Sequence, residues 1–116
     1  MRTIIAGSRG ITSLPLIEEA VKASGVTITE VVSGTAKGVD TLGEEWAEKN
    51  SIPVKRFPAQ WDTFGKSAGY KRNVQMAEYG EVLVSLWDGV SRGTKHMIDI
   101  AKSKGLKVFV FRVHNS

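Results

Sequence analysis

Cysteine is absent from this sequence, and histidine occurs only twice. A chain without cysteine cannot form disulfides, use a thiolate in catalysis, or ligate zinc or iron–sulfur clusters through sulfur. The two histidines, His96 and His114, also make a poor metal-binding pair, because His114 lies near the C-terminus, where chains usually fray. We therefore expect no metal site.

Long apolar runs are missing as well. Met1 and Arg2 lead directly into the short stretch TIIAG, so nothing at the N-terminus resembles a signal peptide. No apolar run approaches the length that is needed to span a membrane, which is about 20 residues. We expect a cytoplasmic protein without a membrane partner.

The signatures of three enzyme classes are also absent. The glycines after the first β-rich run lack the spacing of the dinucleotide-binding fingerprint, and no P-loop with its lysine and hydroxyl residue occurs. Asp40, Asp62 and Asp88 lie on separate segments and form no recognisable carboxylate pair. These absences disfavour an ATPase, a standard dehydrogenase and a paired-carboxylate hydrolase.

What the chain does have is the composition of one globular domain. Its 116 residues are 41% hydrophobic and 24% charged, so residues 1–116 are expected to form a single domain. The net charge of +4 and the pI near 9.5 favour an anionic partner. Because the lysines and arginines are spread along the chain, a phosphate-bearing small molecule fits this charge at least as well as nucleic acid does.

Strand and helix patterns alternate along the chain. Short β-rich runs occur at residues 2–7, 30–34, 53–59, 81–87 and 107–113. Each of the first four is followed by apolar residues at helical spacing, with Gly25, Gly80 and Gly105 as stop signals. This alternation predicts an α/β fold. We expect a single Rossmann-like domain with a parallel five-stranded sheet, helices on both faces and strand order 3-2-1-4-5.

Four segments follow strand ends, at residues 7–12, 33–40, 58–73 and 87–97. In such sheets, ligands bind outside the carboxyl ends of the strands, near the point where the strand order reverses. We therefore expect the four segments to converge on one rim and to form a binding crevice there.

The first two segments combine small residues with polar side chains. Glycines beside Ser8 and Arg9 would let the backbone approach a ligand, although a plain tight turn with a solvent-facing Arg9 is the alternative. In the second segment, amides before a helix can form an anion-binding concavity. Asp40 would either cap that helix or bind ribose hydroxyls. The candidate ligand residues are Gly7, Ser8, Arg9, Ser33, Gly34, Thr35, Gly38 and Asp40.

The other two segments add cations, aromatic rings and a second anion-binding concavity. The third begins with a long loop through QWDTFGK, in which Trp61 and Phe64 either stack on a base, as Tyr70 can, or plug the end of the sheet. In the fourth, Ser91 or Thr94 can cap a helix whose free amides hold an anion. Two anion-binding concavities that face one crevice suit a nucleotide or a diphosphate better than a single inorganic anion. The candidates are Lys66, Arg72, Asn73, Trp87, Asp88, Ser91, Arg92, Gly93 and Thr94.

Four stretches together resemble a known family: GSRGIT, SGTAKGVDTLGEEWA, PAQWDTFGKSAGYKRNVQMA and WDGVSRGTKHMIDIAKSKGLKV. They are similar to the small YspA and cpYpsA-related branch of the SLOG superfamily, and the resemblance covers nearly the whole chain. It implies a Rossmann-like fold and a nucleotide or nucleotide-derived ligand, with ADP-ribose-type signals in some branches. The LOG enzymes of this superfamily cleave the N-glycosidic bond of nucleoside monophosphates, using an arginine in RKxxM and a glutamate in PGGxGTxxE.

The two LOG patterns match this sequence only in part. RNVQM aligns Arg72 with the LOG arginine, but Asn73 replaces the lysine. DGVSRGTKHM keeps Gly93 and Thr94, but Met97 stands where the glutamate would be. Methionine can neither stabilise an oxocarbenium-like transition state nor activate water. The resemblance therefore implies ligand binding more directly than LOG-type hydrolysis.

Three functions remain as hypotheses. The first is binding of AMP, ADP-ribose or an NAD-derived ligand by a sensor or sequestering module that requires no cofactor. The second is a LOG-like nucleoside-monophosphate phosphoribohydrolase, an N-glycosidase in which Arg72 acts with Asp40. DprA-like binding of single-stranded DNA ranks last, because no arginine-rich stripe occurs. A homodimer or higher homo-oligomer is a further hypothesis, with Trp46 and Tyr79 either at its interface or in the core.

Overall fold

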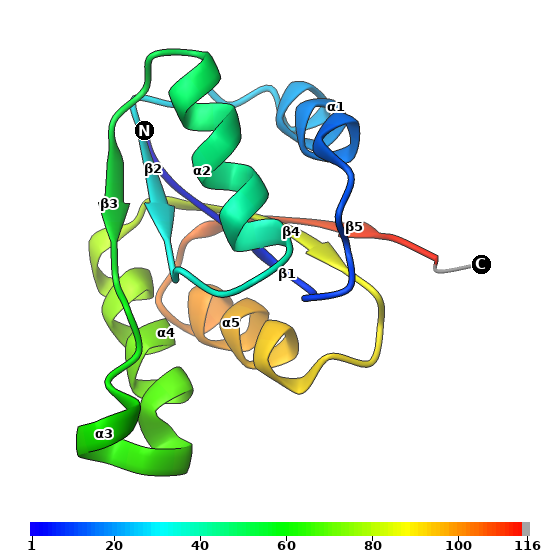
Figure 1. The fold of residues 1–116 in the computed structure, drawn as a ribbon. Coiled ribbons are helices and arrows are strands. Elements are labelled where there is room, and N and C mark those ends of the chain that lie inside the picture. The colour runs from blue at the N-terminus through cyan, green and yellow to red at the C-terminus, as the bar shows by residue number, and fades with distance from the viewer. Residues whose placement is uncertain (115–116) are drawn as a thin grey trace.

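The computed structural model describes residues 1–114 as one parallel sheet with helices on both faces (Figure 1). The strands are β1 (Arg2–Gly7), β2 (Glu30–Ser33), β3 (Val54–Arg56), β4 (Val82–Trp87) and β5 (Lys107–Arg112). The helices are α1 (Leu14–Ser24), α2 (Val39–Lys49), α3 (Trp61–Phe64), the 3₁₀-helix η1 (Gly65–Ser67), α4 (Ala68–Tyr79) and α5 (Arg92–Ser103). The strand order β3-β2-β1-β4-β5 confirms the predicted Rossmann-like α/β fold.

Two apolar clusters cover the two faces of the sheet, because successive side chains of a strand point to opposite faces. Ile4 and Ile5 of β1 are both fully buried but belong to different clusters. The cluster of Ile5 lies under α1 and α2, and the cluster of Ile4 lies under α4 and α5 (Figure 1). Trp46 packs partly buried against the first cluster and Tyr79 against the second, so both rings contribute to the core.

The third connection differs from the expected open loop. β3 is an edge strand of only three residues, shorter than the predicted run 53–59. Pro58 has no N–H group to donate, so the strand cannot continue through it. The chain then forms α3 and η1, and the first of these turns is closed by Phe64, which donates to the Gln60 carbonyl at 3.0 Å.

The predicted glycine stop signals end helices for different reasons. Gly25 follows α1 in the left-handed conformation, with φ of 68°, and donates to the Lys22 carbonyl. Gly80 follows α4 with extended backbone instead. A Cβ atom on Gly80 would lie 2.9 Å from Ile4 Cγ1, so close packing against β1 explains this glycine.

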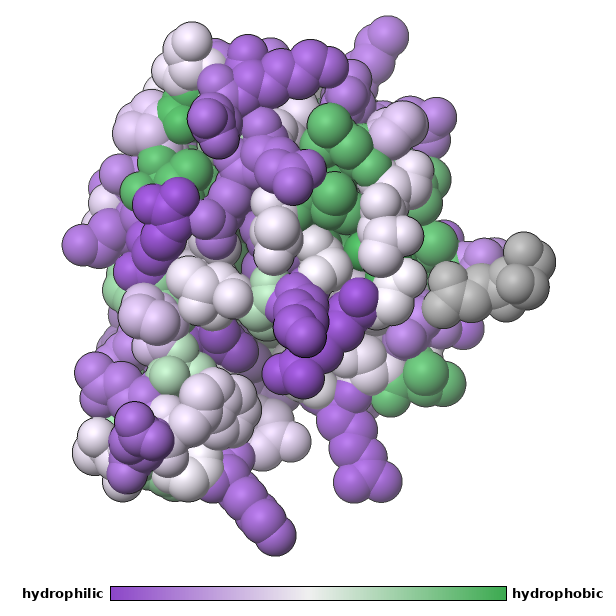
Figure 2. All heavy atoms as spheres, in the orientation of Figure 1, coloured by the Kyte–Doolittle hydropathy of each residue, from purple (hydrophilic) through white to green (hydrophobic). Residues whose placement is uncertain are grey.

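The outer surface is largely hydrophilic on the side seen in Figure 2. Hydrophobic side chains gather there beside α1 and β5, and the α3 segment forms a separate lobe next to the body (Figures 1 and 2). None of the helices that residues 1–114 form is long and apolar enough to cross a membrane.

Candidate functional site

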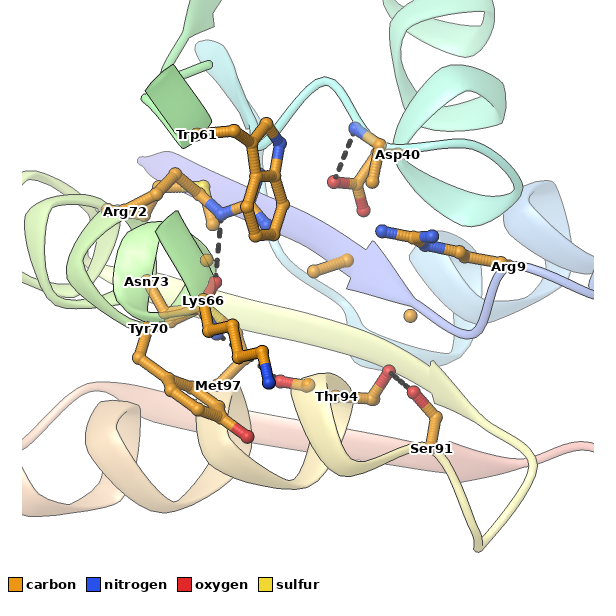
Figure 3. Close-up of a pocket in the computed structure, with 16 residues that line it drawn as sticks. Arg9, Asp40, Trp61, Lys66, Tyr70, Arg72, Asn73, Ser91, Thr94 and Met97 are labelled. Atoms are coloured by element: carbon orange, nitrogen blue, oxygen red, sulfur yellow. Dashed lines mark hydrogen bonds between the residues drawn. The ribbon is translucent and has the colours of Figure 1, made fainter. Parts of the chain in front are cut away.

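One pocket at the carboxyl ends of the strands collects residues from all four predicted rim segments (Figure 3). Its volume is about 230 Å³. The end of β1, the loop before α2, the α3–η1 segment, α4 and the start of α5 all contribute to its walls. The lining residues are Ala6, Gly7, Arg9, Ala36, Asp40, Trp61, Lys66, Gly69, Tyr70, Arg72, Asn73, Met76, Ser91, Gly93, Thr94 and Met97.

Asp40 is a buried carboxylate in the wall of this pocket. Only 4% of the residue is exposed, and its Oδ2 accepts a hydrogen bond from the Ala36 amide at 3.2 Å. Burial raises the pKa of Asp40 from 3.8 to about 6, although the Ala36 bond and the nearby Arg72 act in the opposite direction. Asp40 therefore orders the turn before α2 and is also a titratable group at the cavity surface.

Arg72 reaches from α4 to the β2–α2 loop. Its Nη1 donates to the Gly34 carbonyl, and its Nε donates to Asn73 Oδ1 at 3.1 Å. Burial lowers the pKa of Arg72; Asp40 opposes this change and Arg9 adds to it. Because Arg9 and Arg72 line the same pocket and repel each other, an anion that contacts both would be favoured.

The start of α5 forms a second polar wall. Ser91 is the residue before the helix, but its hydroxyl makes no bond to a helix amide, so the expected side-chain cap does not form. Ser91 Oγ lies 3.0 Å from Thr94 Oγ1 instead. Since the first N–H groups of a helix have no intrahelical partner, this end of α5 presents donors and a positive potential to the pocket.

Several predicted ligand residues build the rim without lining the cavity. Ser8 is 1% exposed, and its Oγ accepts a bond from the Asp88 amide at 3.1 Å. Asp88 Oδ1 accepts bonds from the amides of Val90 and Ser91 at 2.9 and 2.8 Å. Trp87 Nε1 donates to the Ser91 carbonyl at 3.1 Å. These residues connect the loop after β1 to the loop before α5, and Arg92 is exposed beside them without lining the pocket.

The turn before α2 has a similar internal construction. The Ser33 hydroxyl donates to Glu44 Oε2 at 2.6 Å and accepts a bond from the Thr35 amide at 3.1 Å. Gly38 has φ of 79°, and a Cβ atom on it would lie 2.6 Å from the Arg9 carbonyl oxygen. Gly38 thus allows the loops after β1 and β2 to pack directly on each other.

Two exposed aromatic rings line the pocket from the third connection. Trp61 of α3 is 51% exposed and Tyr70 of α4 is 46% exposed. Figure 3 draws Trp61 and Tyr70 at different sides of the cavity, with Lys66 between the two rings. Phe64 of α3 is 40% exposed as well. Rings that plugged the end of the sheet would be more deeply buried than these three.

Sequence reasoning did not single out the small and apolar part of the lining as ligand residues: Ala6, Ala36, Gly69, Met76 and Met97. Met97 occupies the position of the LOG glutamate in the sequence. It is 1% exposed and forms part of the cavity wall. The sequence offers one feature that could have predicted Ala36 and Gly69 as lining residues, which is their small size within rim segments. Small residues are equally common in turns, so this feature does not distinguish a cavity wall from a turn. Among residues 1–114, no group of three metal-binding side chains is found.

Comparisons with known proteins point to one family. The profile of the YspA, cpYpsA-related SLOG family matches residues 1–64. Gene 61 protein of Mycobacterium phage D29 is 33% identical over 87 residues, which is 70% of each chain. No solved structure matches. The matched family region ends at α3, so Arg72 and the start of α5 lie outside it.

Proposed function

This chain belongs to the YspA, cpYpsA-related SLOG family, and we propose that it binds one nucleotide or nucleotide derivative in the pocket at the carboxyl ends of its strands. Membership in this family suggests a nucleotide-related ligand. One observation carries the proposal: a single pocket joins two arginines and the open N-terminus of a helix with two exposed aromatic rings. The phosphate of a nucleotide binds to cationic groups and free amides, and its base stacks on aromatic rings.

The phosphate binds where Arg9 approaches the start of α5. Thr94 and Gly93 belong to the first turn of that helix, where backbone amides and the helix dipole favour an anion. In Figure 3 the Ser91–Thr94 pair and Arg9 are drawn toward the same end of the pocket. Guanidinium groups add charge-assisted bonds to phosphate oxygens, which are stronger than bonds between neutral groups.

The base stacks on the aromatic rings at the other end. The rings of Trp61 and Tyr70 are exposed, and a base would cover part of this apolar surface. Stacking of a base on an aromatic side chain contributes about 1–3 kcal/mol and does not demand a particular base. Asp40 lies in the wall between these groups and accepts bonds from ribose hydroxyls.

The size of the cavity favours one mononucleotide unit. Its volume of about 230 Å³ is smaller than the roughly 300–1,000 Å³ that is usual for pockets of drug-sized ligands. A nucleoside monophosphate therefore fills the pocket, whereas the second ribose of ADP-ribose would extend beyond it. AMP is the first ligand to test. Met97 supplies no carboxylate at the position of the LOG glutamate, so we favour a sensor or sequestering module over a LOG-type enzyme.

Calorimetric titration tests this proposal directly. AMP, ADP-ribose, cyclic ADP-ribose and NAD are each titrated into the purified protein and into Arg9→Ala. We expect AMP to bind and Arg9→Ala to weaken it about tenfold or more, since bonds to charged groups contribute about 1.5–3 kcal/mol. Arg56→Ala is the matched control, because Arg56 pairs with Glu44 at the edge of the sheet, outside this pocket. Absence of binding for all four ligands would contradict the proposal.

The position of Asp40 favours a second candidate function, N-glycoside hydrolysis. Asp40 and Arg72 line one pocket, and a carboxyl with a pKa of about 6 is suited to accept a proton near neutral pH. In this reaction water attacks C1′ of AMP and gives a proton to Asp40. The N-glycosidic bond breaks, its electron pair goes to the base nitrogen, and that nitrogen takes up a proton from solvent, to which Asp40 later returns its own. The products are ribose 5-phosphate and adenine.

Release of free adenine from AMP, followed by chromatography, tests the second candidate. Asp40→Asn cannot take up the proton and should lower the rate about 100-fold or more. A rate that survives both Asp40→Asn and Arg72→Ala rules out this catalytic assignment and leaves the binding proposal untouched.

A further inference from the structure

Asn73 connects three separate parts of the pocket wall. The residue is 5% exposed and lies on α4 beside Arg72. Its Oδ1 accepts the Nε–H of Arg72 at 3.1 Å, and its Nδ2 donates to the Gly93 carbonyl at 3.3 Å. The same Nδ2 lies 3.1 Å from Nδ1 of His96 on α5. Since Arg72 also bonds to Gly34, this junction links the β2–α2 loop, α4 and α5.

The donors and acceptors of this junction determine the state of His96. An asparagine side chain has one acceptor oxygen and two N–H donors. Arg72 can only donate, so it must face Oδ1 of Asn73, and both N–H groups then point to Gly93 and His96. His96 Nδ1 must therefore accept. The ring is neutral in this arrangement, with its proton on Nε2.

We propose that Asn73 and His96 are positioning residues that hold the Arg72 guanidinium in its ligand-binding orientation, and that protonation of His96 on Nδ1 releases it. A protonated Nδ1 would place an N–H donor against the N–H donor of Asn73. The Asn73 amide would then have to rotate, and it would lose the oxygen that Arg72 Nε requires. The consequence for ligand affinity rests on the proposed function, whereas the junction itself does not.

Burial of His96 and the charges around it together set the pH at which this happens. On α5 the charged group that acts on His96 is Asp99, which pairs with Lys95 at 2.7 Å. From α4 the ring is faced by Tyr70, at a centroid distance of 4.5 Å, and by Asn73 next to Arg72. Burial lowers the pKa of His96 below 6.5, and Asp99 opposes this change. The release therefore occurs on the acid side of pH 6.5.

The first test uses the unliganded protein. Proton–nitrogen NMR spectra of the arginine Nε–H groups are recorded from about pH 7.5 to 5.5 for the wild type and His96→Asn, with Arg72→Lys to assign the signal. Asparagine at this position offers an oxygen near the place of Nδ1 that does not titrate. We expect the Arg72 signal to shift with the His96 imidazole titration in the wild type and not in His96→Asn. A shift that is the same in both proteins, or no distinct Arg72 signal in either, overturns the proposal.

The second test adds AMP as the probe. Titration of the ligand phosphate and of Asp40 affects both proteins, so the wild-type affinity is divided by that of His96→Asn at each pH. We expect this ratio to fall about fivefold or more between about pH 7.5 and 5.5, as loss of one hydrogen bond to a charged group predicts. His96→Ala, which has no acceptor, should bind more weakly than His96→Asn throughout. A ratio that stays constant contradicts the proposal. If AMP does not bind but the NMR shift is found, the positioning stands and the proposed function fails.

Discussion

Arg72 Nη1 and Asp40 Oδ2 approach Gly34 from two sides, and each would lie 2.8 Å from a Cβ atom on that glycine. Gly34 is thus the place where a cation from α4 and a carboxylate from α2 come together on the β2–α2 loop. Any larger residue would push at least one of these groups away. Two segments that are far apart in the sequence thus meet at Gly34, and they bring groups of opposite charge into the pocket wall.

Substitution of Gly34 should affect the ligand more than the fold. In Gly34→Ala the Cβ atom meets the ends of two side chains, which can move, so we expect a loss of about 1 kcal/mol in unfolding free energy. The displaced Arg72 should weaken AMP binding about tenfold or more. Urea unfolding and calorimetry measure the two effects.

Gly38→Ala is the informative contrast. Its Cβ atom would meet backbone atoms of Ser8 and Arg9, and φ is 79°, so we expect a larger stability loss of about 2 kcal/mol or more. In Gly93→Ala the Cβ atom would meet nothing within 4 Å, and its stability should change by less than about 1 kcal/mol. Equal stability of all three variants would contradict this account.

Asp40 should make the protein less stable as the pH rises. In the unfolded chain its carboxyl ionises near the ordinary pKa of 3.8, whereas in the folded chain it ionises near 6. Between these values the unfolded state releases its proton first, so folding loses stability, in total about 3 kcal/mol above pH 6. Asp40→Asn should remove this loss.

Urea unfolding of wild type and Asp40→Asn from about pH 4 to 8 checks this linkage. The two proteins should be similar in stability near pH 4, and the variant should be the more stable protein at neutral pH. Parallel pH profiles would show that Asp40 does not titrate differently in the two states.

Trp61 should contribute to affinity only for ligands that carry a base. Trp61→Ala removes the stacking surface and should weaken AMP binding by about 1–3 kcal/mol, which is roughly 5- to 150-fold. Ribose 5-phosphate lacks the base, so its affinity should change little. Phe64→Ala is the control, because Phe64 is an exposed ring on the same short helix that does not line this pocket. Equal losses for the two ligands would place the base elsewhere.

Ser8 should act on the pocket through the loops and not through a ligand contact. Its buried hydroxyl accepts the Asp88 amide, and Ser8→Ala would leave that amide without this partner. We expect a loss of about 1–3 kcal/mol in unfolding free energy without any ligand present. Ser13→Ala is the control, because the Ser13 side chain makes no cap bond to α1. A stable Ser8→Ala protein with weakened AMP binding would instead indicate direct ligand contact.

The sequence by itself determined the architecture. Strand and helix periodicity is a local property of a few neighbouring residues, so the alternation along the chain predicted a parallel sheet, and the right-handed crossover rule limited its windings. The strand order then followed correctly. The rule that ligands bind at the carboxyl ends of parallel strands also predicted, from the sequence alone, which four segments would form the pocket.

Only the tertiary structure decided which side chains in these segments face the cavity. Ser8, Ser33 and Asp88 have the residue types of ligand contacts, yet their side chains bond to backbone amides of the rim loops and, for Ser33, to Glu44 of α2. Asp40 owes its raised pKa to burial, and the junction of Asn73 and His96 forms because α4 and α5 pack side by side. Spacing along the chain determines where a helix or strand lies, whereas a side chain's partners depend on residues brought near it by the fold.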